Sequence, residues 1–117
     1  MIHRQSDMTV EIRSNLRGGV GDLPFRHLFS KEELGGRADL LAAVTLQPGE
    51  SVGEHPHVSN GEVYWILSGS ATVTEDGQAA ILQPGDAEFC AGGHTHSIYN
   101  HTQEPVTFLA LIVPDRP

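Results

Sequence analysis

Turn signals recur at short intervals along this chain, and this spacing constrains the fold more than any other feature. Glycine and proline pairs interrupt regular structure strongly, and the runs between them suit strands better than helices. The signals are Gly18-Gly19, Gly21-Asp22, Gly35-Gly36, Pro48-Gly49, Ser68-Gly69, Asp76-Gly77, Pro84-Gly85, Gly92-Gly93 and Glu104-Pro105. Many short antiparallel strands joined in this way indicate a sandwich or a barrel.

Seven segments between the turns are expected to be strands. They are residues 40–46, 63–67, 71–75, 78–82, 87–90, 97–101 and 106–113. Asp76-Gly77, between two of these segments, predicts a two-residue hairpin of type I′. One short helical turn is also expected, because Ser30 and Glu33 form a capping box and Gly35-Gly36 ends the segment.

Composition limits the class of protein. At 117 residues the chain suits one domain with a single core. A net charge of −8 with only seven Lys and Arg argues against nucleic acid as a partner. The apolar runs are too short for a membrane span, and residues 1–20 lack the apolar core of a signal peptide. Cys90 is the only cysteine, so we expect a cytoplasmic protein without an intrachain disulfide.

A His-X-His pair points to a metal site. Residues i and i+2 of a strand face the same side, so His55 and His57 can reach one point together. Glu62 follows His57 by five residues, past Ser59, Asn60 and Gly61, and a turn there brings its carboxylate back to the imidazoles. Imidazole with carboxylate suits a divalent transition metal (Mn, Fe, Co, Ni or Zn) better than calcium or magnesium.

The same residues carry a resemblance to the cupin family. Gly49, His55, His57, Glu62 and Gly69 match every fixed position of the first cupin motif. In the second motif Gly85, Gly93, His96 and Asn100 match, while Ala91 stands where the family usually has proline. The resemblance spans residues 49–100 and implies that His96 is the fourth metal ligand. It also implies an all-β fold, the double-stranded β-helix or jelly-roll barrel.

This fold implies an arrangement of the chain and of its faces. We expect residues 1–36 to pack on the barrel as a strand plus the short helical turn, and residues 37–117 to form the barrel. If Glu62 points inward, Tyr64 and Ile66 do too, and Trp65 and Leu67 face outward. That outward set is too apolar for a wetted surface, which predicts a second sheet, a covering segment or a partner, with a homodimer favoured.

Other residues near the motifs have less definite roles. His94 either points toward the cavity, as a proton-transfer group, or lies on its rim. Tyr64 is either a cavity acid or a core aromatic. Asn100 is expected to orient His96 or the loop rather than to bind metal. Cys90 is expected to be a small buried residue rather than a nucleophile.

Several polar residues receive a structural interpretation. Structural or surface roles are expected for His3, His27 and His101, and places on the solvated acidic surface for Glu54, Asp86 and Glu88. The sequence supplies no clearly basic anchor for a ligand. Among the Lys and Arg residues, Arg26 and Arg37 are nearest to expected strands, and neither can be placed in the cavity.

Two functions fit these features. The first is a metalloenzyme acting on a small polar carboxylate or a sugar-derived acid, with His94 or Tyr64 as candidate catalytic groups. A proton-transfer reaction, isomerisation or a non-oxidative lyase step, is favoured over oxygen chemistry. The alternative is a metal-dependent module that binds a small ligand without turnover. A second acid or base facing the ion favours catalysis, and its absence favours binding.

Overall fold

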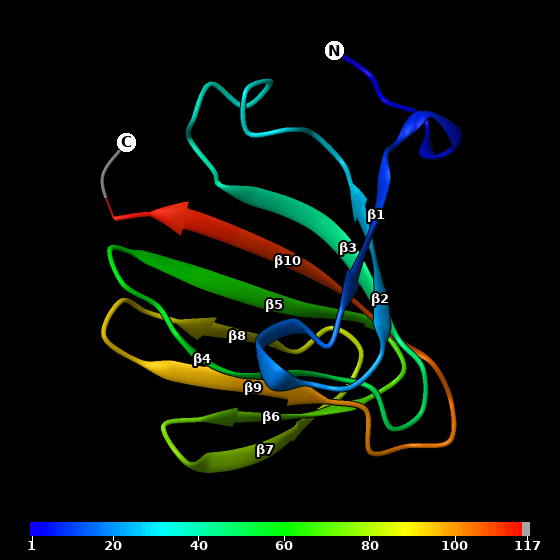
Figure 1. The fold of residues 1–117 in the computed structure, drawn as a ribbon, viewed down its shortest axis with the longest axis vertical. Coiled ribbons are helices and arrows are strands. Elements are labelled where there is room, and N and C mark those ends of the chain that lie inside the picture. Colours follow the sequence, from blue (N-terminus) through cyan, green and yellow to red (C-terminus); the bar gives the residue numbers. More distant parts are fainter. Residues whose placement is uncertain (116–117) are drawn as a thin grey trace.

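Two antiparallel β-sheets face each other and enclose the core (Figure 1). The structure is a computed structural model, and it describes residues 1–115. One sheet has six strands in the order β1-β2-β3-β10-β5-β8, and the other has four in the order β4-β9-β6-β7. The strands are β1 (Val10–Ser14), β2 (Asp22–His27), β3 (Leu40–Leu46), β4 (Ser51–Pro56), β5 (Asn60–Ser68), β6 (Ala71–Glu75), β7 (Gln78–Leu82), β8 (Ala87–Cys90), β9 (Thr95–Tyr99) and β10 (Val106–Pro114).

The N-terminal segment is part of the sheet as well as a cover for it. Its two strands, β1 and β2, extend the six-stranded sheet beyond β3, where a single strand was expected. Two short 3-10 helices accompany them, η1 (Gln5–Asp7) and η2 (Leu16–Gly18). Within residues 1–115 no helix is long and apolar enough to cross a membrane.

The predicted capping box forms, and the chain makes one turn there without continuing into a regular helix. The Ser30 amide donates to Oε1 of Glu33 at 2.8 Å, and the Glu33 amide donates to Oγ of Ser30 at 3.1 Å. Residues 31–36 are nevertheless hydrogen-bonded turns. Gly35 and Gly36 both have positive φ, 65° and 73°, so the backbone leaves the helical conformation before a second turn can follow.

Side chains along β5 alternate between the core and the outer surface as predicted. Tyr64 and Ile66 are buried, whereas Trp65 and Leu67 are 44% and 42% exposed. On β9, His96 and Ile98 are buried on one face, and Asn100 just beyond the strand is buried as well. The inward faces of both sheets therefore form one core, and the polar groups of the site lie at one end of it.

Candidate metal centre

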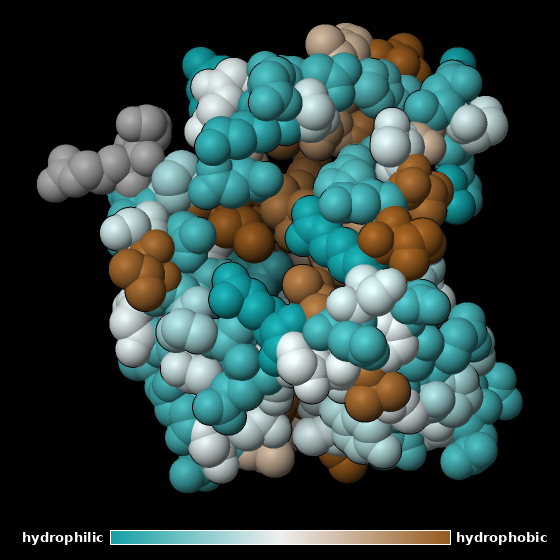
Figure 2. Space-filling view, viewed as in Figure 1, coloured by the Kyte–Doolittle hydropathy of each residue, from teal (hydrophilic) through white to brown (hydrophobic). Residues whose placement is uncertain are grey.

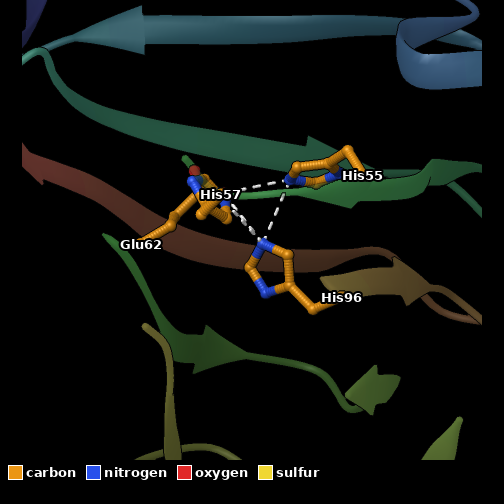
Figure 3. A group of neighbouring side chains, drawn as sticks. All are labelled: His55, His57, Glu62 and His96. Carbon is orange, nitrogen blue, oxygen red and sulfur yellow. Dashed lines mark hydrogen bonds and ion pairs between the residues drawn. The ribbon is translucent and has the colours of Figure 1, made fainter. Parts of the chain in front are cut away.

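Four predicted ligands converge inside the barrel from three strands (Figure 3). His55 is on β4, His57 follows that strand, Glu62 is on β5 and His96 is on β9. Their ligand atoms all lie within 4.8 Å of one another, and each residue is at most 5% exposed. We call these four residues, His55, His57, Glu62 and His96, the ligand cluster.

The backbone explains why residues distant in sequence meet here. His55 on β4 is the direct cross-strand partner of His96 on β9, so their side chains share a face. The His57 amide donates to the His94 carbonyl at 3.0 Å, which continues the pairing beyond the strands. Ser59, with a φ of 62°, reverses the chain between β4 and β5 and returns Glu62 to the two imidazoles.

Distances within the ligand cluster match those of donors around a single ion. Oε1 of Glu62 lies 3.3, 3.2 and 3.0 Å from Nε2 of His55, His57 and His96. Nε2 of His96 lies 3.1 Å from Nε2 of both other histidines. Two donors about 2.1 Å from one ion are about 3.0 Å apart at a right angle and about 3.4 Å apart at the tetrahedral angle.

The outer ring nitrogens of all three histidines are held by oxygen acceptors. Nδ1 of His55 donates to the Gly53 carbonyl at 2.8 Å, and Nδ1 of His57 donates to Oδ1 of Asn60 at 2.8 Å. Nδ1 of His96 donates to the Glu88 carboxylate at 2.9 and 3.0 Å. These bonds fix the ring orientations and turn every Nε2 toward the same point, as in metal sites.

The electrostatics of the ligand cluster favour positive charge. Burial would raise the pKa of Glu62, but hydrogen bonds from three imidazoles outweigh it and hold that pKa far below its usual range. Burial alone would lower the pKa of His96. Hydrogen bonds and charges from Glu62 and Glu88 outweigh burial and raise that pKa to about 9. A proton is thus retained among these groups, and a divalent cation at the same point would take its place.

Glu88 contacts the ligand cluster, and its prediction as part of the solvated acidic surface is wrong. Its side chain is only 12% exposed and accepts both hydrogen bonds from His96. Strand parity contained the signal, because Glu88 lies two residues before Cys90, which was expected to be buried, and so shares its face. Glu54 and Asp86 are exposed, as predicted.

Cys90 is buried beside the site and is not a thiolate. Burial, followed by the charges of Glu88 and Glu75, raises the pKa of Cys90 to about 12. Cys90, Glu88 and His96 lie within 4.8 Å of one another and form a second conceivable ligand group. Glu88 already holds the outer nitrogen of His96, so the ligand cluster is the better site.

His94 is not brought to the ligand cluster. Its side chain is 51% exposed, and its Nδ1 pairs with the carboxylate of Asp76 at the hairpin between β6 and β7. The Asp76 hydrogen bond raises the pKa of His94, and the same bond lowers the pKa of Asp76. The structure therefore does not show His94 pointing toward the cavity, the first of the two positions considered for it.

Tyr64 lies against the ligand cluster. It is 2% exposed, and its ring stacks on His96 with centroids 4.5 Å apart and planes 7° apart. Burial, together with the nearby Glu62 and Glu88 carboxylates, raises the pKa of the Tyr64 hydroxyl well above its usual value. The hydroxyl therefore stays protonated.

Asn100 organises a loop. Its side-chain amide donates to the carbonyls of Leu46 and Glu104 at 3.0 and 2.7 Å, and its Oδ1 accepts from the Thr102 amide and hydroxyl. The buried Asn100 side chain thereby holds the turn that leads from β9 into β10.

A cavity of about 330 Å³ opens onto the ligand cluster. Its lining includes His55, His57, Glu62 and Tyr64, together with Arg13 and Arg17 of the N-terminal segment. Arg26 and Arg37, the two arginines nearest to the expected strands, do not line the cavity. Nothing in the local pattern of residues 10–18 marks Arg13 and Arg17, because their place depends on how this segment crosses β4.

Comparison with known proteins shows the family. A cupin domain model matches residues 42–112. The "oxalate-binding protein" of Thermotoga maritima is 40% identical over 113 residues, covering 97% of this chain and 93% of that protein. The tetracenomycin polyketide synthase protein TcmJ of Streptomyces glaucescens is 30% identical over 92 residues, covering 79% of this chain and 62% of that protein.

A solved structure agrees over nearly the whole length. The crystal structure of a "predicted oxalate decarboxylase" from Thermotoga maritima matches with a TM-score of 0.92 and 39% identity, covering 97% of this chain and 99% of that one. Both motifs, the paired sheets and the buried histidine and glutamate group agree with these matches. The chain therefore belongs to the cupin family.

Proposed function

We propose that this cupin holds a divalent transition metal in the ligand cluster and captures a small carboxylate at the positions that the protein leaves open. The observation that carries the proposal is the orientation of the three imidazoles: each Nδ1 is held by an oxygen, so each Nε2 points to Glu62. A bound ion would supply Lewis acidity toward a carboxylate oxygen.

A small carboxylate suits the cavity beside the ligand cluster. The chain is acidic overall, with a net charge of −8, yet two of its seven Lys and Arg residues, Arg13 and Arg17, line this cavity. The Thermotoga maritima relative is named for binding oxalate, the smallest dicarboxylate. Oxalate is therefore the first ligand to test.

The structure favours binding over turnover in one respect. His94, the better of the two candidate proton donors, points into solvent and pairs with Asp76, away from the cavity. His94 therefore offers no acid or base to a ligand held at the ion. Binding without chemistry needs only the ligand cluster and an ion held by it.

Two measurements test the proposal. Protein purified without an affinity tag or added metal is expected to contain about one equivalent of a first-row transition metal by elemental analysis. Calorimetric titration with oxalate is expected to give saturable binding to the loaded protein and none after chelation. A protein that neither contains nor takes up such an ion, or binds oxalate equally well without it, would rule the proposal out.

A metal-dependent lyase is the second candidate function, because Tyr64 offers a buried protonated hydroxyl in the cavity wall. A non-oxidative lyase or isomerase step needs such a proton donor. The metal-loaded protein should then consume oxalate, keto acids or uronates, and Tyr64→Phe should abolish turnover while metal content stays normal. No turnover across this panel would leave binding as the function.

The proposal includes a homodimer in the cytoplasm with no nucleic-acid partner. Two rows of apolar side chains cross the outer face of the six-stranded sheet in register. One row is Leu41, Leu111, Val63 and Phe89, and the other is Ala43, Leu109, Trp65 and Ala87. Phe89 and Trp65 are 53% and 44% exposed, which supports a second copy as their cover.

A further inference from the structure

Part of the wall of the cavity comes from a short piece of the N-terminal segment. Arg13 lies on β1, and Leu16 and Arg17 lie on η2. Figure 2 shows a hollow in this face of the molecule, with hydrophobic side chains in its depth and hydrophilic ones along its rim. A ligand that reaches the ion therefore also faces this wall.

This wall is fixed against the strand that carries His55. A Cβ on Gly53 would lie 2.1 Å from the Arg17 carbonyl oxygen, and a Cβ on Gly19 would lie 2.3 Å from the Ser51 carbonyl oxygen. Only glycine allows the two backbones to approach so closely. The Ser51 amide also donates to the Val20 carbonyl at 3.0 Å, and the Val20 amide donates to Oγ of Ser51 at 3.0 Å.

The two arginines differ in whether a neighbouring group already balances their positive charge. Arg13 donates to Oε1 of Glu11 at 3.1 Å, and its guanidinium lies 4.4 Å from the centroid of the Phe25 ring. Arg17, in contrast, makes no salt bridge within residues 1–115. Its positive charge beside the cavity is free to meet an anion.

Apart from the ligand cluster and the arginines, the lining of the cavity is mostly apolar. Side chains that line it include Leu16, Phe25, Leu40, Val52, Phe108 and Ile112. Pockets of about 300 to 1,000 Å³ hold drug-sized molecules, and a two-carbon dicarboxylate would fill only a small part of this one at about 330 Å³. Oxalate at the ion would leave most of the cavity unfilled.

We propose that the cavity selects a longer diacid: one carboxylate with its neighbouring oxygen lies at the ion, an apolar chain crosses the cavity, and the far carboxylate pairs with Arg17. This rests on the proposed function, since the first carboxylate needs the metal. Arg17 is then a specificity-determining residue for chain length and for the second charge. Oxalate is a truncated ligand that uses only the metal end.

Calorimetry with matched ligands tests this inference. The protein is loaded with the ion that elemental analysis identifies and titrated with oxalate, 2-oxoglutarate, 2-oxoadipate and 2-oxopimelate. Each oxo diacid is paired with the 2-oxo monoacid of the same chain length. At the favoured length the diacid is expected to bind about tenfold more tightly than its monoacid, because a charged hydrogen-bonded pair contributes about this much.

Variants assign the effect to Arg17. Arg17→Met keeps the length of the side chain and the positive φ of the backbone, and it should reduce the diacid to the affinity of its monoacid without changing oxalate binding. Arg17→Lys should restore part of the preference. Arg37→Met removes the same charge from an exposed position outside the cavity and should change nothing. Metal content and the circular dichroism spectrum confirm that each variant is folded.

The outcomes separate this inference from the proposed function. If oxalate binds but no diacid exceeds its monoacid, or if Arg17→Met leaves the preference intact, the diacid inference is overturned and metal-dependent capture of carboxylates stands. If the loaded protein binds neither oxalate nor any oxo acid, the proposed function itself fails, and the inference fails with it.

Discussion

At the scale of single residues, the three histidines of the ligand cluster form a site only because their outer nitrogens are held. His57 illustrates this, since Asn60 and Glu62 bind its two nitrogens and the Glu62 hydrogen bond raises its pKa. The imidazole is therefore oriented and electrostatically matched to a cation. Spacing on the sequence can identify the ligands, whereas these outer contacts depend on the fold.

The first residue-level prediction concerns His57 itself. His57→Ala removes one of four ligands, so metal content after purification should fall by more than tenfold, an effect larger than the roughly tenfold loss caused by removing a supporting residue. The variant should also lose the thermal stabilisation that added metal gives the parent. His94→Ala, the matched control outside the cavity lining, should retain full metal content. Full occupancy in His57→Ala would show that the site is wrongly assigned.

The second residue-level prediction concerns Glu88. Within residues 1–115, His96 is the only member of the ligand cluster that Glu88 contacts by a hydrogen bond. Glu88→Gln keeps the shape but removes the charge that supports the imidazole. Metal affinity, measured by competition with a chelating dye, should fall by about tenfold to hundredfold. Glu54→Gln, an exposed change on β4, should leave metal affinity unchanged. An equal loss in that variant would show that the overall charge of the protein, and not the contact with His96, causes the effect.

At the scale of elements, sequence patterns located the strands that have a clear turn at each end. β3, β6, β7 and β8 have the predicted bounds. Asp76 and Gly77 have positive φ values of 50° and 80°, as a type I′ turn requires. β9, in contrast, begins at Thr95 and ends at Tyr99, two residues early, because Asn100 turns inward to hold the next loop.

The sequence was least informative where an element depends on a distant partner. β1 exposes both Val10 and Ile12, so it has no buried face to reveal it, and it is held by pairing with β2. The close contact of η2 with β4 is likewise invisible in a local pattern, although it positions Arg17. This is why the convergence of the ligand cluster could be predicted and the cationic wall of the cavity could not.

The prediction that belongs to this scale concerns the contact between η2 and β4. Gly53→Ala would place a methyl group 2.1 Å from the Arg17 carbonyl oxygen, so one backbone must move. The free energy of unfolding should fall by about 1 to 3 kcal/mol, as for other overpacked sites. Denaturant unfolding of the metal-free protein measures it, with Glu54→Ala on the same strand as the control. An unchanged midpoint for Gly53→Ala would show that η2 is not held against β4.

At the scale of the whole molecule, the ligand cluster connects the two sheets, because His55 and His96 belong to the four-stranded sheet and Glu62 belongs to the six-stranded one. An ion bound there would link them and would be absent from the unfolded chain. Free ion at a concentration of about a hundred times its dissociation constant adds about 2.7 kcal/mol to the free energy of unfolding. For a chain of this length that corresponds to roughly 10 °C in melting temperature.

Metal removal tests this link. Treatment with a chelator, followed by dialysis, should lower the melting temperature by about 10 °C, and adding back the ion should restore it. His57→Ala is the matched control, since chelation should scarcely change its melting temperature. Equal melting of loaded and chelated parent protein would mean that the ion does not bridge the sheets.

The outer face of the six-stranded sheet predicts how the whole molecule assembles. Leu109 stands between Ala43 and Trp65 in one apolar row on the outer face of the six-stranded sheet, and Leu111 stands between Leu41 and Val63 in the other. Because a twofold axis would bring this apolar face of two copies together, light scattering should give twice the 12.6 kDa mass of one chain. Leu109→Lys should yield monomers that still bind metal, whereas Val20→Lys, an apolar position outside the sheet, should remain dimeric. A monomeric parent at micromolar concentration would contradict the dimer, and a dimeric Leu109→Lys variant would place its interface elsewhere.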